Sequence, residues 1–260
     1  MLQQMLQFLL YFFSHPSVWG IGLALIFGAV WLACYRPPFL KEPWLWAVLV
    51  AGAVLAPITL AVLSYPLRYG ISIVYGQFWT AETLSQWALL ASLPSMYVFG
   101  LVREGFKLLP LVFIWWRKDW QITPALGLTS GAVCGAGFGI LEAMWTHNYI
   151  FYTGWTWERV QLQGIGQLAG FWESFFLLGA SLASTAFVGW GMGKRRWWQC
   201  YLLSAVIYLV INYNYVLVRK EIVSAAQAEF IIAACVLLIA GIVLWLREKS
   251  YGTNAVPKMV

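Results

Sequence analysis

Apolar residues fill this chain in blocks of about 20 residues, and the short segments between the blocks carry most of its Lys and Arg residues. An α-helix needs a run of that length to cross the hydrocarbon core of a bilayer. The pattern therefore predicts an all-α, polytopic transmembrane helical bundle in one membrane domain, residues 1–260. About seven spans are expected. They lie near residues 17–35, 44–64, 84–116, 123–145, 167–193, 198–218 and 227–246.

Two segments depart from a simple series of straight spans. Residues 1–14 are apolar but lack the basic start and the cleavage site of a signal peptide, so we expect a short interfacial helix there. The block at 84–116 is too long for one straight helix. Its Pro94 and the charged cluster at 103–107 predict a kinked or re-entrant entry followed by the spanning part.

Composition excludes a soluble domain, because only 10% of the residues are charged and 62% are hydrophobic. The net charge of +6 is spread over short loops instead of forming one basic face. It therefore indicates contact with an anionic membrane surface and argues against nucleic acid as a partner. The four Cys residues stand singly in apolar blocks, so the sequence predicts neither a disulfide framework nor a zinc knuckle.

Cations are distributed unequally between the two sets of loops, which sets the expected orientation. The loops at 36–43, 117–122 and 194–197, together with a tail at 247–260, carry ten Lys and Arg residues, and the opposite loops carry four. We expect a multi-pass integral membrane protein with its N-terminus outside and its C-terminal tail in the cytoplasm.

The charged residues inside the predicted spans include Arg103, Glu104, Lys107, Glu142 and Glu173. A charge at bilayer depth costs several kcal/mol unless it is paired or hydrated, and it therefore marks a candidate site. Glu104 and Lys107 are three apart and share a helix face. Either they form an internal ion pair, or the cations hold a carboxylate that acts on water, a metal or a substrate.

Four glycines, at 127, 131, 135 and 139, recur every four residues in the fourth span and predict close approach of a neighbouring helix. Glu142 follows three residues after the last of them and is expected at the edge of that contact. His147 stands in a polar patch that we expect to end the helix. It is either an interfacial residue or a ligand.

Three segments resemble motifs of the PrsW, YhfC and CAAX-type intramembrane proteases, which share an Aph-like fold. Residues 103–107 resemble a Glu-Glu-x-x-Lys motif with Glu104 as the second glutamate, and 135–143 resemble a glycine-rich helix that ends in a glutamate. Residues 173–181 resemble a segment in which a glutamate precedes a metal-binding histidine by eight residues. The order of helices agrees over residues 84–218, which implies an intramembrane protease fold.

The chain departs from that pattern where the resemblance implies metal ligands. Phe138, Ser181, and Tyr208 or Asn212 stand at the expected histidine positions. Arg103 replaces the first glutamate. A catalytic zinc site needs about three protein ligands, and His147 is the only plausible candidate ligand. We therefore expect no cofactor and, in particular, no zinc.

Three functions remain open. The first is a non-catalytic binding or scaffold subunit of this fold, in contact with lipid and with other membrane proteins. Its binding residues would be Arg103, Glu173, Ser181, Tyr208 and Asn212. The second is an intramembrane peptidase acting on a membrane peptide. In it, Glu104 would activate water, Glu142 would assist as its partner or as proton donor, and Lys107 and Arg103 would keep Glu104 ionised. The third is a transporter of ions or small molecules.

Overall fold

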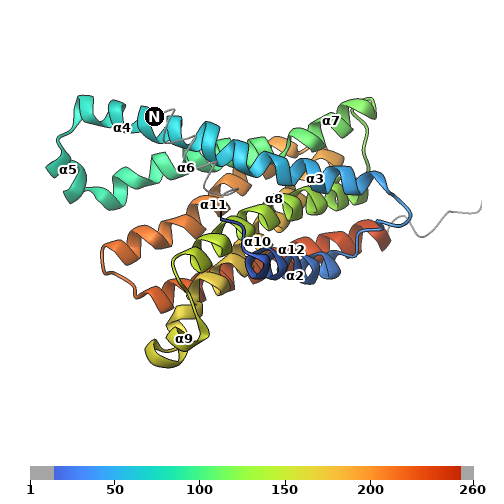
Figure 1. Ribbon diagram of the computed structural model, residues 1–260. Helices are drawn as coiled ribbons and strands as arrows, with labels where there is room; N and C mark the ends of the chain where they lie inside the picture. The colour runs from blue at the N-terminus through green and yellow to red at the C-terminus, as the bar shows by residue number, and fades with distance from the viewer. Residues whose placement is uncertain (1–14, 253–260) are drawn as a thin grey trace, which may run out of the picture.

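The computed structural model describes residues 15–252, and this part of the chain contains helices and turns but no β-strand (Figure 1). The interfacial helix expected at residues 1–14 lies outside the described residues. The elements in order are α2 (Val18–Tyr35), α3 (Trp44–Pro57), η1 (Ile58–Ser64), α4 (Tyr65–Phe78), α5 (Ala81–Gln86), α6 (Ala88–Lys107), α7 (Leu109–Arg117), α8 (Pro124–Tyr152), α9 (Trp157–Gln163), η2 (Ile165–Leu168), α10 (Ala169–Gly193), α11 (Trp197–Arg219) and α12 (Ala225–Gly252).

Among the described residues, six helical stretches are long and apolar enough to cross a membrane. Each overlaps one of the predicted spans, so the expectation of an all-α polytopic bundle is confirmed. The six stretches are Val18–Tyr35, Trp44–Phe78, Pro124–Tyr152, Ile165–Gly193, Trp197–Arg219 and Ala225–Tyr251. The predicted span at 84–116 is not among them.

That segment is divided into α5, α6 and α7. Pro94 lies inside α6, and the break falls at Leu108. The physical reason is Pro110, which has no N–H to donate to the preceding turn and therefore starts a new helix in its first turn.

The divided segment nevertheless runs along α11 from end to end. At one end the Lys220 amine donates a hydrogen bond to the Ser85 carbonyl over 2.9 Å. At the other end the ring centroids of Trp115 and Trp197 are 6.3 Å apart. The segment thus occupies the place of a seventh helix in the bundle.

The second predicted span continues past residue 64. In the structure α3 passes through the π-helical turn η1 into α4, and the helical path ends only at Phe78. Pro57 and Pro66 lie at either side of this turn. Since a proline cannot donate its backbone N–H, each leaves a carbonyl of the previous turn unpaired. The wider turn between them keeps the chain helical instead of ending it.

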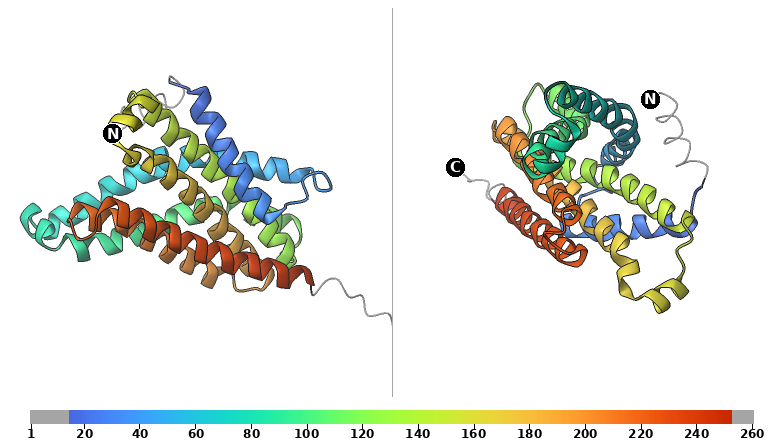
Figure 2. Two further views of the ribbon diagram at one scale, coloured as in Figure 1. Left: turned by 90° about the horizontal axis from the view of Figure 1, so that it is seen from below. Right: turned by 90° about the vertical axis from the view of Figure 1, so that its left-hand side faces the viewer.

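The glycine-rich helix α8 lies inside the bundle, between α3 on one side and α2 and α10 on the other (Figure 2). All four glycines predicted to form a stripe face α10. A Cβ atom on Gly131 or Gly135 would overlap a backbone carbonyl of α10. On the α3 side, a Cβ atom on Gly137 would overlap the carbonyl of Leu49. The backbones of α8 and its neighbours are therefore in direct contact.

The contact between α8 and α10 predicts how adding one methyl group at Gly135 changes the stability of the protein. Gly135→Ala should lower the stability of the purified protein by about 1–3 kcal/mol, because the new Cβ atom collides with the Ser181 carbonyl and the helices must separate. Thermal unfolding in detergent measures the change.

Gly241→Ala is the matched control, because a Cβ atom there meets nothing within 4 Å. We expect its melting temperature to match or exceed that of the wild type. Equal melting temperatures for the two variants would contradict the close packing of α8 and α10.

Candidate functional site

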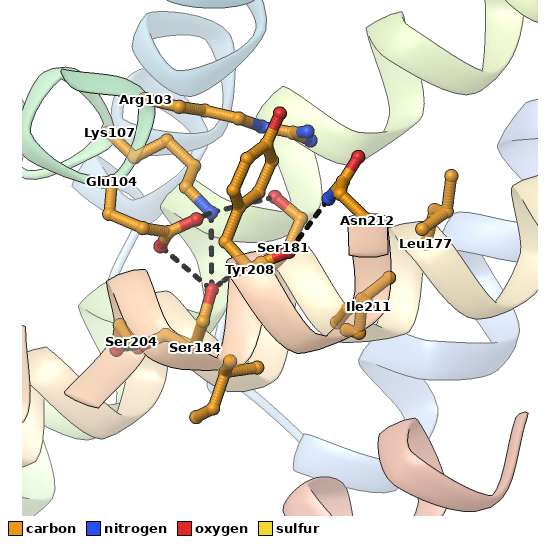
Figure 3. Close-up of a pocket in the computed structure, with 12 residues that line it drawn as sticks. Arg103, Glu104, Lys107, Leu177, Ser181, Ser184, Ser204, Tyr208, Ile211 and Asn212 are labelled. Carbon is orange, nitrogen blue, oxygen red and sulfur yellow. Dashed lines mark hydrogen bonds and ion pairs between the residues drawn. The ribbon is translucent and has the colours of Figure 1, made fainter. Parts of the chain in front are cut away.

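Four helices bring polar side chains to one place inside the bundle (Figure 3). The carboxyl-terminal turn of α6 supplies Arg103, Glu104 and Lys107, and the neighbouring helix α8 supplies Glu142 through its ion pair with Arg103. Helix α10 supplies two serines, and α11 supplies Tyr208, Asn212 and Ser204. We refer to Glu104, Lys107, Ser181 and Ser184 as the buried centre.

Glu104 and Lys107 are both fully enclosed, with exposed fractions of 3% and 1%. Their ion pair is short, with 2.6 Å between the Lys107 Nζ and Glu104 Oε1 atoms. Helical geometry explains the pairing, because residues three apart project from the same face. The internal ion pair, one of the two alternatives that the spacing left open, is therefore present.

Two serines of α10 complete the buried centre. The Lys107 ammonium donates to Ser184 Oγ over 3.1 Å and lies 3.5 Å from Ser181 Oγ. Ser184 in turn donates its hydroxyl hydrogen to Glu104 Oε2 over 2.9 Å. Cation, hydroxyl and carboxylate thus form a closed ring, as the dashed lines of Figure 3 indicate.

Arg103 links the buried centre to α8. Its guanidinium forms an ion pair with Glu142 and lies 5.0 Å from the ring centroid of Tyr208 and 5.3 Å from that of Phe138. A guanidinium stacked between aromatic faces gains cation–π stabilisation that partly replaces lost hydration. The Nε atom of Arg103 is buried and has no hydrogen-bond partner among the described residues.

Glu173 lies elsewhere, because eight residues of helix separate it from Ser181, about 12 Å along the axis of α10. It accepts a hydrogen bond from the Tyr215 hydroxyl and interacts with Glu229 of α12. It does not line the pocket around Glu104. The structure therefore brings together all of the predicted binding and catalytic residues except Glu173. Those that meet are Arg103, Glu104, Lys107, Glu142, Ser181, Tyr208 and Asn212.

His147 is not at the end of its helix, and that expectation is wrong. Helix α8 continues to Tyr152, and His147 is fully buried against the first turn of α2. Its Nδ1 atom lies 3.2 Å from the carbonyl oxygen of Gly20, and its ring packs against Phe27. Close approach of α2 at a glycine explains this burial.

Ser184 is the main residue of the centre that sequence reasoning missed. Its position three residues after Ser181 places both hydroxyls on one face of α10, and this spacing could have identified it. Ser204 also escaped notice. Its hydroxyl donates to the Ser184 carbonyl over 3.3 Å, a contact between α10 and α11 that no local pattern contains.

The cavity at the buried centre measures about 20 Å³. That volume holds roughly one water molecule. Lys107 is one of the residues that line it, and its ammonium lies 5.6 Å from the ring centroid of Phe138. The centre is consequently a closed polar network with room for a single small molecule.

The donor set does not fit a catalytic metal. Among residues 15–252, no three His, Cys, Asp or Glu side chains lie together as a metal-binding group. The chain has two histidines in all, His15 and His147, and both lie among the described residues. Neither lines the cavity at the buried centre.

Comparison with protein families gives a match over residues 41–242 to the model of the PrsW family intramembrane metalloproteases. The match covers well over half of the chain. The chain therefore belongs to the PrsW family. The match extends on both sides beyond residues 84–218, the region in which the sequence motifs resemble this family. No curated protein and no solved structure matches the chain.

As a PrsW family member, the chain has the family's membrane protease domain. Ser181, at a position where the resemblance implies a histidine, instead lies beside the Lys107 ammonium. Phe138, at a second such position, faces the two cations.

The ion pair predicts the effect of replacing the Glu104 carboxylate by an amide. Glu104→Gln leaves the Lys107 ammonium buried without its carboxylate, so the free energy of unfolding should fall by about 3–5 kcal/mol. The double variant Glu104→Gln, Lys107→Met should recover most of this loss, because it removes the uncompensated charge and leaves an acceptor for Ser184. Thermal unfolding in detergent measures both changes.

Glu82→Gln serves as the control, since Glu82 is exposed in the short helix α5. Its stability should change by no more than about 0.5 kcal/mol. Wild-type stability of the Glu104→Gln variant would contradict a compensating role for this carboxylate.

Proposed function

We propose that this PrsW family member is a non-hydrolytic binding or scaffold protein of the membrane. The observation that carries the proposal is the position of Lys107 Nζ, which contacts Glu104 over 2.6 Å and lies within reach of both serines. The tethered ammonium occupies the centre of the residues that the family resemblance assigns to catalysis.

The proposal is supported by the partners that each carboxylate already has. One oxygen of Glu104 pairs with Lys107 and the other accepts from Ser184. Glu142 is paired with Arg103. Peptide hydrolysis requires a base aligned with a water molecule and a group that stabilises the developing oxyanion. The closed network leaves room for about one water and none for a peptide carbonyl beside it.

We propose no cofactor for this activity. The absence of zinc is supported by the donor set, in which lysine, serine and phenylalanine stand near the carboxylates instead of imidazole. The partners that fit a closed, helical and apolar body are the lipid bilayer and membrane-embedded protein segments.

A glutamate-dependent peptidase is the second candidate. It is favoured by one observation: Arg103 and Lys107 lie side by side, so Glu104 and Glu142 belong to one network next to a cavity of the size of a water molecule. In that function Glu104 would take the proton of the water, and Glu142 would supply one to the leaving amine.

Metal content and cleavage distinguish the two candidates. We expect the purified protein to contain less than stoichiometric zinc by elemental analysis, and to leave a labelled transmembrane peptide in proteoliposomes intact. Stoichiometric zinc that is lost in Glu142→Gln or His147→Ala would show a metalloenzyme. Cleavage by the wild type that falls about 10²–10⁴-fold in Glu104→Gln would show a glutamate-dependent peptidase.

We also propose an orientation, with the N-terminus outside and the C-terminus in the cytoplasm. The ten-to-four distribution of cations supports it. The arrangement of helix ends is compatible with it, because Gly193 packs against Pro124 and Trp115 against Trp197. These contacts gather two of the cation-rich loops at one end of the bundle.

Cysteine labelling tests this orientation. In a background without the four natural cysteines, Arg159→Cys should react with a membrane-impermeant maleimide on intact cells, and Lys194→Cys should react only after permeabilisation. Equal labelling of the two positions on intact cells would overturn the proposal.

A further inference from the structure

A second polar cavity lies between α4, α6 and α11, next to the buried centre. It measures about 290 Å³, far more than one water requires. Tyr208 and Asn212 line both cavities. The other polar residues around it are Arg68, Ser95, Tyr215 and Arg219.

The charge of this cavity is its distinctive property. Arg68 and Arg219 come from helices 151 positions apart in sequence, and both line it. No ion pair joins either of them to a carboxylate in the part of the chain that the structure describes, and no Asp or Glu is among the lining residues. Arg68 packs over the ring of Phe99, 5.3 Å from its centroid. Two guanidinium groups at one cavity without an acid form a site for an anion.

Guanidinium groups bind phosphate with paired, charge-assisted hydrogen bonds, which favours a phosphate group as the anion. The Asn212 side chain also lines the cavity and can add a further polar contact.

The position of the cavity favours a lipid as the source of the phosphate. Arg219 is the last residue of α11, one of the stretches able to cross a membrane. The end of such a stretch lies at the level of the lipid headgroups. Lys220, which follows it, donates a hydrogen bond to the Ser85 carbonyl and holds this end of α11 beside α5.

An apolar hollow of about 570 Å³ adjoins the cavity between α4 and α6, and Ser95 lines both. Most of its wall is aliphatic, with Leu67, Ile71, Val74 and Val98 among the lining residues. An acyl chain matches such a hollow in polarity. The polar cavity matches the phosphate headgroup of a phospholipid, and the apolar hollow matches its acyl chain.

We infer that Arg68 and Arg219 form a binding site for the phosphate of an anionic phospholipid, whose acyl chain lies in the hollow between α4 and α6. The site is separate from the ion pair of Glu104 and Lys107, and the inference does not depend on whether the buried centre hydrolyses peptides. It assigns to α4 and α6 a lipid ligand that holds them together.

Titration of the full-length protein in a neutral detergent with dioctanoyl phosphatidylglycerol, followed by native mass spectrometry, tests this inference. The double variant Arg68→Gln, Arg219→Gln should bind this lipid at least about tenfold more weakly than the wild type, since each guanidinium supplies a charge-assisted hydrogen bond. The single variants should show intermediate losses, and they replace the double variant if it does not fold.

The double variant Arg117→Gln, Arg195→Gln is the matched control, because both residues are exposed and the change in charge is the same. Its affinity should stay within about twofold of the wild type, because neither Arg117 nor Arg195 lines the cavity. Wild-type affinity of the Arg68 and Arg219 variant, or an equal loss in the control, would overturn the inference.

Competition identifies the source of the phosphate. Inorganic phosphate at the concentration of the lipid should leave lipid binding unchanged, because it cannot fill the apolar hollow, and dioctanoylglycerol should compete poorly because it lacks the phosphate. Displacement of the lipid by an equal concentration of inorganic phosphate would instead assign the site to free phosphate and reject the lipid.

Discussion

Direct contact between the backbones of α8 and α10 is the constraint on which the rest of the structure depends. Glycines facing α10 at every fourth residue of α8 leave no side chain between the two helices. Within a bilayer, where the hydrophobic effect gives helices little reason to associate, such contact supplies van der Waals packing over a long surface. The contact also fixes the position of Ser181 along the axis of α8, because the Ser181 carbonyl would collide with any Cβ atom on Gly135. The contact thereby places the two serines of α10 within reach of the Lys107 ammonium.

The charges of α6 are stable inside the bundle because every one has a partner. Lys107 has Glu104 and Ser184, and Arg103 has Glu142 and two aromatic rings. Removing one partner of a buried ion pair costs more free energy than the pair itself contributes. This asymmetry makes each of these charged residues depend on its partner.

The proposed non-hydrolytic role is compatible with membership in the PrsW family. The family model extends over residues 41–242 and assigns a membrane protease domain. The side chains at the positions implied for metal ligands are an aromatic ring, Phe138, and a hydroxyl, Ser181, and both of them lie near Lys107. One fold can hold different sites, because the glycine contact at Ser181 is made with its backbone carbonyl and does not depend on its side chain.

The amino-acid sequence was enough to predict the helical membrane class, a close helix contact at the glycines and a shared helix face for Glu104 and Lys107, because each depends on hydropathy or on spacing along one helix. It did not determine which helices meet. The burial of His147 under α2 and the meeting of Arg68 with Arg219 across α4 and α11 were decided by tertiary packing. Contacts between residues far apart in sequence leave no local pattern. Their physical origin is the fit of helix surfaces, which only the assembled bundle defines.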